Sequence, residues 1–258
     1  MLNALTFELS KVEDLGVRER IRDLMNEVDH ELATSLARNI GVKPPGQPKH
    51  KNSGQKSKFL SMIASPYTPM DSIATRRVAV IVGDGYSGDD LKALRAILTE
   101  QGAKLAIVGT HKGYLYADGA PGAADMGAKA AEEDGKPHDD CVKADFTIFN
   151  SKSVLFDSVA LIGGSHTSLL QANGNVKAFV AEALKHCKAV MATGNTIPLL
   201  TYPCQVAGIT LSDGSDKLVN DQAVVTSGKQ TKEVLTAFVE AMKLHRCWDR
   251  KGVDAIPA

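Results

Sequence analysis

The residues whose types and spacing could support chemistry gather at one corner, in the stretch KAVMATGNTIP at positions 188–198. An apolar run typical of a buried strand ends there in small residues, and a helix pattern follows. In an α/β protein such a corner holds a phosphate loop or a nucleophile on a strained turn. Ala192 stands at the apex, before Thr193 and Gly194. The spacing predicts an elbow that lacks its nucleophile, unless the corner is only a tight turn.

The phosphate-loop interpretation depends on four residues of this corner. The segment Thr193–Thr196 resembles the T-G-N-T portion of the flavodoxin phosphate loop, although that loop follows the first strand and this one follows a late strand. With one Trp and five Tyr, the chain offers no evident pair of aromatic rings to enclose a flavin. Binding of a flavin or another phosphate ligand here stays an alternative, while our expectation is that the chain binds no cofactor and no metal.

A second glycine-rich turn, GDGYSG at residues 83–88, follows an apolar run and precedes a helix pattern. This G-x-G-x-x-G spacing suits a dinucleotide pyrophosphate at a helix N-terminus. However, Asp84 would place a carboxylate beside the phosphates, and Asp89 and Asp90 would add two more. The next strand ends at Gly109-Thr110, without an acidic residue for the ribose hydroxyls. We therefore interpret the motif as a strand-to-helix turn capped by acidic residues.

Two further groups could take part in catalysis. In LIGGSHTSLL, Gly163-Gly164 could supply an amide-lined pocket, and Ser165 is followed directly by His166. Neighbouring side chains usually point in different directions, so surface or capping roles are expected for Ser165 and His166. The four cysteines, Cys141, Cys187, Cys204 and Cys247, form no C-x-x-C pair, which predicts burial rather than metal binding. Their even number leaves room for a disulfide that the sequence cannot assign.

The overall composition limits the classes of partner. The chain has 258 residues, with 30 basic and 30 acidic side chains and 43% hydrophobic residues. Such a chain can bury a sizeable core, and its zero net charge gives no reason to expect a nucleic acid or an anionic membrane as partner. No apolar run approaches the ~20 residues of a membrane span. The first residues, MLNALTFELSKVED, lack the apolar region of a secretory signal.

Residues 1–43 predict two short amphipathic helices. Asp29 fits the N-cap of the second helix, and Gly41 fits its end. Two such helices cannot bury their apolar stripes alone, so we expect them to belong to something larger. The stripes consist of Val17, Ile21, Leu24, Met25 and Val28 in the first helix, and of Leu32, Leu36 and Ile40 in the second.

Residues 44–74 are rich in Pro, Gly, Ser and Lys, which predicts an extended linker; its segment FLSMIASPY, at 59–67, is apolar. From residue 75 strands alternate with helices, and this alternation predicts a parallel sheet covered on both faces, a flavodoxin-like doubly wound α/β domain. The expected strands are RRVAVIVGDG, AKLAIVG, DFTIFN, SVLFDSVALIGG, KAVMAT and QAVVTSG. The expected helices are GDDLKALRAILTEQG, NVKAFVAEALKHC and TKEVLTAFVEAMKLH.

Three segments, in this order along the chain, resemble haem catalases of the large-subunit class. LTFELSKVEDLGVRERIRDLMNEVDHELATSLARNIGVKPP resembles the end of their helical region. VLFDSVALIGG and HRCWDRKGVDAIPA resemble their extra C-terminal domain. The resemblance covers nearly the whole chain. It implies C-terminal helices of a catalase core at 1–43, a linker at 44–74 and a flavodoxin-like domain at 75–258.

In that class the extra domain belongs to the ThiJ/PfpI superfamily, whose active members carry a Cys at the elbow, an acidic residue after the first strand and often a His. The resemblance places Ala192 at the position of that Cys and the acidic position at or near Asp90. The segment after the elbow, LLTYPCQVAGITLSDG, contains no His. Cys204 lies beyond the first turns of the following helix and cannot simply replace the missing thiol. The Cys-dependent activities are therefore expected to be absent.

The resembled parent decomposes hydrogen peroxide at a haem that this chain does not hold. The leading hypothesis is a non-catalytic accessory domain that packs on the catalase core, stabilises the tetramer and, on its own, acts as an ATP-independent holdase for unfolding client proteins. One alternative is a glyoxalase or peptidase with a rearranged site at Asp90, His166 and Cys204. The other is the flavin or phosphate module at Thr193–Thr196. The resemblance leaves the compartment open, because such catalases are cytoplasmic or secreted.

Overall fold

The structure is a computed structural model that describes residues 1–50, 70–120 and 140–257. The chain divides into two compact units, Met1–Thr68 and Pro69–Ala258. Most of the predicted linker, and the whole of its apolar segment 59–67, lie outside the described residues. No helix in the described part of the chain is long and apolar enough to cross a membrane.

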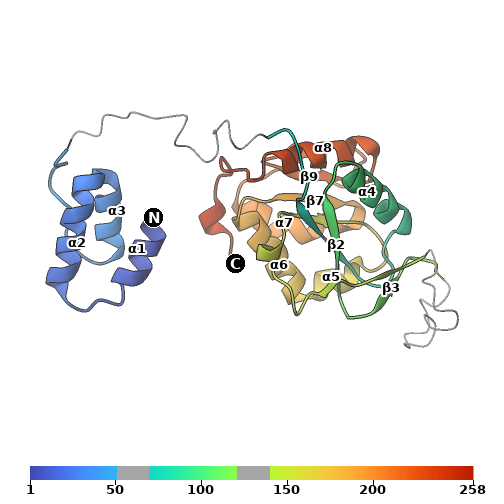
Figure 1. The fold of residues 1–258 in the computed structure, drawn as a ribbon, viewed down its shortest axis with the longest axis horizontal. Helices are drawn as coiled ribbons and strands as arrows, with labels where there is room; N and C mark the ends of the chain where they lie inside the picture. The colour runs from blue at the N-terminus through green and yellow to red at the C-terminus, as the bar shows by residue number, and fades with distance from the viewer. Residues whose placement is uncertain (51–69, 121–139, 258) are drawn as a thin grey trace. The chain divides into compact units, whose positions relative to one another are not determined.

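The N-terminal unit contains three helices, one more than the two predicted: α1 (Leu2–Leu9), α2 (Leu15–Val28) and α3 (His30–Asn39) (Figure 1). Asp14 and Asp29 cap α2 and α3 by accepting backbone N–H bonds, and Gly41 ends α3 with a left-handed φ of +70°. Asp29 and Gly41 thus have the predicted roles.

The apolar stripes of α2 and α3 are partly buried within this unit, against the expectation that the two helices cannot cover them. Helix α1 supplies the missing partner surface. A small core consists of Leu9, Leu36, Ala37, Ile40 and Val42, with Leu2, Leu5, Val12, Ile21 and Met25 packed against it. Besides Met1, four large apolar side chains in the described part of this unit nevertheless stay exposed: Phe7, Leu15, Leu24 and Val28. We refer to these four side chains as the N-terminal apolar surface.

The second unit is a seven-stranded sheet in the order β5-β2-β1-β6-β7-β9-β8, parallel except for β8 at one edge. This confirms the predicted doubly wound α/β fold. Its strands are β1 (Arg77–Val82), β2 (Lys104–Gly109), β5 (Phe146–Thr147), β6 (Ser158–Leu161), β7 (Ala189–Thr193), β8 (Val219–Asp221) and β9 (Val224–Ser227). A separate antiparallel pair, β3 (Tyr114–Tyr116) and β4 (Cys141–Lys143), was not predicted.

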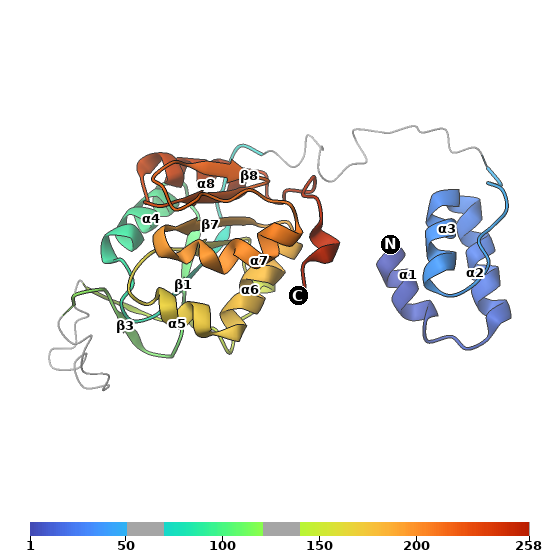
Figure 2. The same ribbon diagram turned by 180° about the vertical axis from the view of Figure 1, so that it is seen from behind.

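Helices cover both faces of this sheet (Figures 1 and 2). On one face α4 (Gly88–Glu100) and α8 (Lys232–Lys243) pack on Val78, Val80 and Met191. On the other face α5 (Thr167–Ala172), α6 (Gly174–Lys185) and α7 (Pro198–Val206) pack on Ile81, Leu161 and Val190. Successive strand residues alternate between the two faces, and the strands therefore read as continuous apolar runs. Three short 3-10 turns complete the unit: η1 (Ser153–Leu155), η2 (Gly194–Thr196) and η3 (Val253–Ala255).

Candidate functional site

The candidate site is the carboxyl edge of the sheet between β1 and β6. The strand order reverses direction here: β1 leads into α4 on one face, while β6 leads into α5 on the other. In doubly wound folds the two loops diverge at such a switch point and leave a crevice that binds ligands. The loops concerned are residues 83–88 after β1 and residues 162–166 after β6.

In this chain the two loops do not diverge, because they are hydrogen-bonded to each other. Tyr86 forms an antiparallel bridge with Gly164, and the backbone N–H of Ser87 donates to Gly163 O at 2.9 Å. A Cβ atom placed on Gly164 would lie 2.3 Å from Gly85 O. The backbones therefore touch where a side chain would have held them apart, and the crevice at the switch point is closed.

The G-x-G-x-x-G turn uses its amides within the protein. The N–H of Gly83 donates to His166 Nδ1 at 2.9 Å, and that of Gly85 donates to Tyr116 O at 2.8 Å. Ser87 caps α4, whose first turn carries Asp89 and Asp90. The interpretation of this motif as a strand-to-helix turn is confirmed, but the cap is Ser87 rather than an acidic residue. Three of its amides, those of Gly83, Gly85 and Ser87, are already bonded within the protein.

His166 is held as a neutral structural side chain. The N–H of Gly83 donates to its Nδ1, so Nε2 must carry the proton, and Nε2 lies 3.0 Å from Ile162 O as a donor. Burial lowers the pKa of His166, and the hydrogen bond that the ring donates to Ile162 O opposes this effect without cancelling it. Both ring nitrogens are occupied, so the imidazole has no free nitrogen with which to act as a base.

The protonation of His166 leads to a testable pH dependence. Because burial lowers its pKa below the ordinary 6.5, the folded chain binds fewer protons here than the unfolded chain. Stability that rests on neutral His166 must then be lost as the pH falls below about 6.5. We expect His166→Gln to cost roughly 1–2 kcal/mol near neutral pH through the lost bonds, and less in acid. Urea unfolding from about pH 7.5 to about pH 5 measures the difference. A difference that is constant with pH would contradict a neutral His166.

Ser165 does not form a nucleophile–base pair with its neighbour. Its hydroxyl donates to Asp118 Oδ1 at 3.1 Å and approaches Gly85 O at 3.3 Å, away from the ring nitrogens of His166. The sequence expectation that adjacent side chains diverge agrees with this geometry. The suggested amide-lined pocket at Gly163-Gly164 is wrong, because Gly164 bonds to Asn195 through both its N–H and its carbonyl.

The elbow residues lie in a relaxed strand end. Ala192 is fully buried inside β7, paired with Leu161 and Thr226, and the left-handed turn comes two residues later, at Gly194 with φ +59°. A nucleophile elbow needs its strained backbone at the nucleophile itself. At position 192 the chain therefore lacks the strained turn as well as the thiol. Thr193 is buried, and its hydroxyl has no partner among the described residues.

The T-G-N-T segment also bonds inward. Asn195 Oδ1 accepts from Thr167 Oγ1 at 2.8 Å, and Asn195 Nδ2 donates to Gly164 O at 2.9 Å. The hydroxyl of Thr196 donates to Thr193 O at 2.7 Å. These contacts join the loop after β7 to the loop after β6. They occupy the side chains of Asn195 and Thr196, two of the groups that a phosphate loop would use to hold its ligand, whereas the Thr193 hydroxyl has no partner among the described residues.

Asp90 and Cys204 lie on opposite faces of the sheet. Asp90 belongs to the first turn of α4, whereas Cys204 packs beneath α7 in the core of the other face. Burial raises the pKa of the Asp90 carboxyl, and it raises the pKa of the Cys204 thiol to about 12. The rearranged site at Asp90, His166 and Cys204 thus has a carboxyl and a thiol separated by the sheet and a histidine with both nitrogens bonded. Among the described residues there is also no group of three His, Cys, Asp or Glu side chains that could hold a metal.

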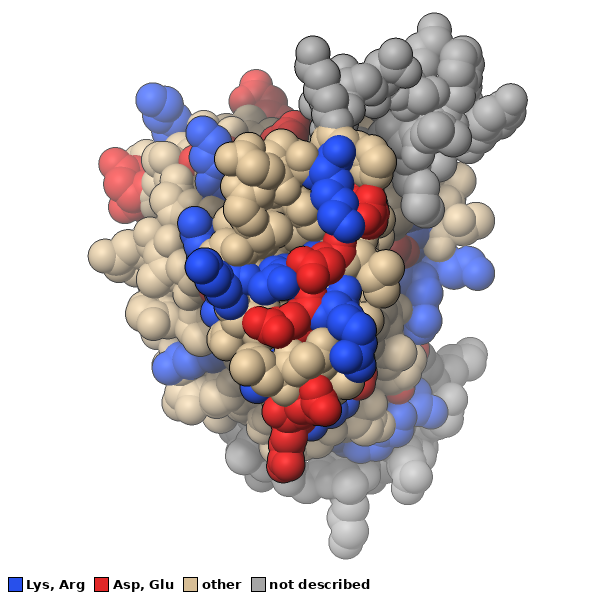
Figure 3. All heavy atoms as spheres, turned by 90° about the vertical axis from the view of Figure 1, so that its left-hand side faces the viewer, with Lys and Arg blue, Asp and Glu red and all other residues tan. Residues whose placement is uncertain are grey.

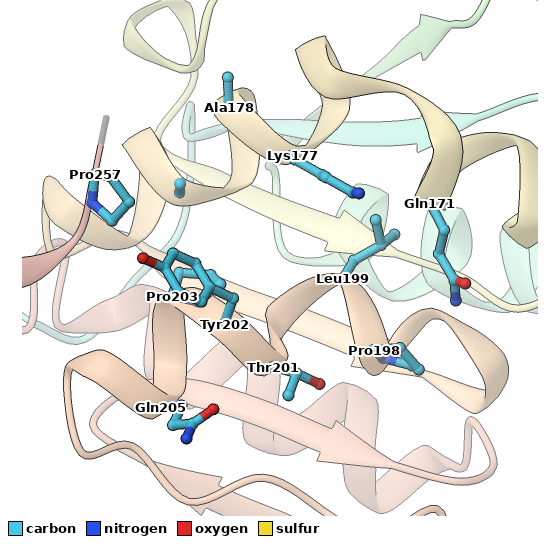
Figure 4. A pocket seen from close by; sticks show the side chains of 11 residues that line it. Gln171, Lys177, Ala178, Pro198, Leu199, Thr201, Tyr202, Pro203, Gln205 and Pro257 are labelled. Atoms are coloured by element: carbon cyan, nitrogen blue, oxygen red, sulfur yellow. The ribbon is translucent and has the colours of Figure 1, made fainter.

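A separate groove of about 640 Å³ lies between α6 and α7. Lys177 and Ala178 of α6 face Leu199 and Tyr202 of α7, and Pro257 closes one end (Figure 4). None of the predicted site residues lines it. Elsewhere on the surface, basic and acidic side chains lie next to one another on the face drawn in Figure 3, in keeping with the 30 charges of each sign.

What the sequence reasoning missed is the contact between the loops after β1 and β6. Its signal is present in the glycines themselves, since Gly85 and Gly164 both have positive φ and neither has room for a Cβ: one on Gly164 would meet the backbone of Gly85, and one on Gly85 would meet the Ser165 hydroxyl. Glycine pairs after two different strands can mean close loop packing as readily as a ligand. Taken together, these features define a doubly wound α/β domain whose usual ligand crevice is closed by its own backbone.

Comparison with known proteins places this domain in a family. Residues 74–252 match the C-terminal domain found in long catalases, and the chain belongs to that family. It is 31% identical to catalase A of Aspergillus fumigatus over 94% of this chain and 31% of that protein. It is 31% identical to catalase HPII of Mycobacterium avium, over 99% of this chain and 33% of that protein. Catalase-2 of Bacillus subtilis is 27% identical over 97% of this chain and 31% of that protein. The resemblance to large-subunit catalases is thereby confirmed. The chain spans about one third of the length of these relatives.

Proposed function

We propose that this chain is a non-catalytic accessory domain of a long catalase, which stabilises the assembled parent and, on its own, holds unfolding proteins without ATP. The observation that carries the proposal is the closed switch-point crevice, where Gly164 and Gly85 bring two backbones into contact. A domain that fills its own ligand crevice gains rigidity there and gives up a place for a substrate. That suits a structural role better than a catalytic one.

The His and Tyr side chains at the candidate site do not suit haem, so the proposal assigns haem to another part of the parent. As haem ligands, a His needs a free ring nitrogen and a Tyr binds as the tyrosinate. Both nitrogens of His166 are bonded to backbone groups. Tyr86 is buried in the closed loops, and burial raises the pKa of its hydroxyl to about 12, which disfavours the tyrosinate.

The stabilising role is supported by the N-terminal apolar surface. Phe7, Leu24 and Val28 are each more than half exposed, although their unit has a core of its own. Leu24 and Val28 are four residues apart and so lie on one face of α2. The chain spans one third of its relatives, which leaves a further polypeptide that could cover these side chains in the parent.

The holdase role is supported by the same surface in the isolated chain. Full burial of one Leu, Val or Phe side chain contributes roughly 1.5–3 kcal/mol, and this favours contact with apolar segments of an unfolding protein. No G-x-x-x-x-G-K-[ST] loop occurs in the sequence, so ATP should have no effect on such binding.

The test compares two triple variants of the full chain with matched exposure. Phe7→Ser/Leu24→Ser/Val28→Ser removes three members of the N-terminal apolar surface. The control, Phe149→Ser/Val154→Ser/Leu155→Ser, removes exposed apolar side chains of the α/β unit. The exposed fractions are similar: 64% and 65% for Phe7 and Val28, against 69% and 71% for Phe149 and Val154. Light scattering of an unrelated heat-denatured enzyme reports protection. We expect the first variant to need roughly tenfold more chain for equal protection, and the control to match the wild type.

Several outcomes would count against the proposal. Loss of protection in the control variant alone would place the surface on the α/β unit. No protection by the wild type would remove the holdase role. The same preparation is assayed with methylglyoxal and with hydrogen peroxide, and turnover of either substrate would overturn the non-catalytic part. Turnover that disappears in Cys204→Ser would identify that thiol as the nucleophile.

A further inference from the structure

The C-terminal tail, residues 244–257, is attached to the start of β7 by contacts between segments about sixty residues apart. The N–H of Cys247 donates to the carbonyl of Cys187 at 2.8 Å. Arg250 donates to Leu184 O at 2.8 Å and to Lys188 O at 3.0 Å, on either side of Cys187. These bonds fix the position of the tail along residues 184–188, so that Cys247 lies next to Cys187.

The backbone bond sets the distance between the two cysteines. A direct N–H···O bond between two residues leaves their Cα atoms roughly 5–6 Å apart, as in paired strands. A disulfide needs a Cα separation of about 4.4–6.8 Å. From the bond between the Cys247 N–H and Cys187 O we expect a Cα separation in that range, and both residues are free thiols in this structure.

Cys187 occupies a position where a side chain is unusual. It follows α6 with a left-handed φ of +57°, and the N–H bonds of Cys187 to Leu184 O and of Lys188 to Ala183 O form the usual helix ending. Glycine is the common residue there, because it takes a positive φ without strain. A cysteine at this place accepts a conformational cost that a glycine would avoid.

Arg250 supplies positive charge beside both sulfurs. Burial raises the pKa of the Cys187 and Cys247 thiols, and the Arg250 guanidinium is the first influence opposing it at each. Arg250 is only 4% exposed, and its side-chain hydrogen bonds within the described residues go to carbonyls, without a carboxylate partner there. Cys247 is half-buried, whereas Cys187 is buried, so an oxidant reaches Cys247 first. The pKa of each thiol thus stays raised, but by less than burial alone would raise it, and the partial exposure of Cys247 leaves its sulfur accessible to an oxidant.

We propose that Cys187 and Cys247 are an oxidation site and form a disulfide that locks the C-terminal tail onto the end of α6 when the chain meets hydrogen peroxide. The Cys247 thiolate attacks one peroxide oxygen, the O–O bond breaks, and a sulfenic acid and one water result once the leaving hydroxide takes up a proton. The Cys187 thiolate then attacks the Cys247 sulfur; the S–S bond forms, and the hydroxyl leaves as the second water. Two thiols are oxidised by two electrons, and one peroxide is reduced to two waters.

The test follows the thiols of the full chain after treatment with hydrogen peroxide, alkylation of the remaining thiols and trypsin digestion. The expected product joins peptides 186–188 and 247–250, with a mass two hydrogens below their sum, and is lost on reduction. Oxidation should also raise the Tm of the wild type by roughly 5 °C or more, because the bond closes a long loop. The tail should become more resistant to cleavage after Arg246 and Arg250.

Three variants make the test specific. Cys204→Ser removes a fully buried thiol that does not take part, so the linked peptide and the Tm shift should both persist. Cys187→Ser and Cys247→Ser should each abolish both effects while leaving the Tm of the reduced protein close to that of the wild type. Oxidation of Cys247 without the linked peptide, or a linked peptide containing Cys204 in place of Cys187, would overturn the proposal. A peroxide-treated wild type with two unmodified thiols would also overturn it.

Discussion

Replacing Gly164 by Ala should lower the free energy of unfolding of the α/β unit by about 3 kcal/mol or more, the combined cost of a glycine-only backbone conformation and of overpacking. Gly164 has φ +143°, and a Cβ there would lie 2.3 Å from Gly85 O and 2.8 Å from Tyr86 Cα. Both neighbours are backbone atoms of the adjoining loop, so they cannot move aside as a flexible side chain would. The contact that closes the crevice must open, or the loops must shift together.

Two other glycines provide matched controls. Gly119 has φ +74°, and no atom of the described residues would lie within 4 Å of a Cβ there, so Gly119→Ala isolates the backbone cost. Gly174 has neither a positive φ nor a close neighbour, and Gly174→Ala should be neutral or slightly stabilising at the start of α6. Urea unfolding followed by Trp248 fluorescence reports on this unit, because Trp248 is the single Trp of the chain. If Gly164→Ala costs no more than Gly119→Ala, the loops are not in contact and the closed crevice is wrong.

Replacing Arg250 by Ala should lower the free energy of unfolding of the α/β unit by about 3 kcal/mol or more, because all the hydrogen bonds of a buried guanidinium are lost at once. The guanidinium donates to three carbonyls on three segments: Leu184 at the end of α6, Lys188 before β7, and Gln222 in the β8–β9 turn at 2.6 Å. It joins the tail to the sheet. Without it these carbonyls lose their charged donor, and Leu184 O keeps only the bond from the N–H of Cys187 that the structure shows.

The geometry of Arg250 sets the controls for this prediction. Arg250→Lys should recover only part of the loss, since one ammonium cannot reproduce a planar fork that reaches three carbonyls. Lys251→Ala changes an exposed neighbour and should be close to neutral. Urea unfolding and limited proteolysis of the tail measure both effects. Equal stability of Arg250→Ala and Lys251→Ala would mean that the tail is held by other contacts.

The β8–β9 turn shows where local sequence signals stop being sufficient. Gln222 and Ala223 form a two-residue turn, and both have positive φ, at +50° and +62°. Such turns normally carry Asn-Gly or Asp-Gly, and so the sequence predicted only the strand that follows. Arg250, twenty-eight residues further along the chain, bonds to the carbonyl of Gln222. A distant side chain supplies part of the stabilisation that turn chemistry usually provides.

The α/β alternation, the cap at Asp29, the helix end at Gly41 and the family could all be predicted from the sequence. These depend on periodicity, on local backbone preferences and on matching segments, all of which can be read within a few residues. Ala192 in place of a thiol could likewise be read directly, although its meaning rested on the resemblance. The shared core of α1, α2 and α3 could not be predicted, because α1 is a distinct helix only through its packing against the other two.

Whether the crevice at the candidate site is open or closed could be seen only in the folded structure. The same glycine spacing at residues 83–88 fits an open phosphate loop or a closed turn, and the difference lies in Gly163 and Gly164, about eighty residues away. From the sequence, His166 was expected on the surface or at a cap, and was a candidate base only in the alternative site. In the structure it is a buried, neutral side chain whose two ring nitrogens bond to Gly83 and Ile162. The pairing of Cys187 with Cys247 depends on the path of the tail. Each of these outcomes is set by hydrogen bonds between distant segments, and a linear pattern carries no information on which partners will meet.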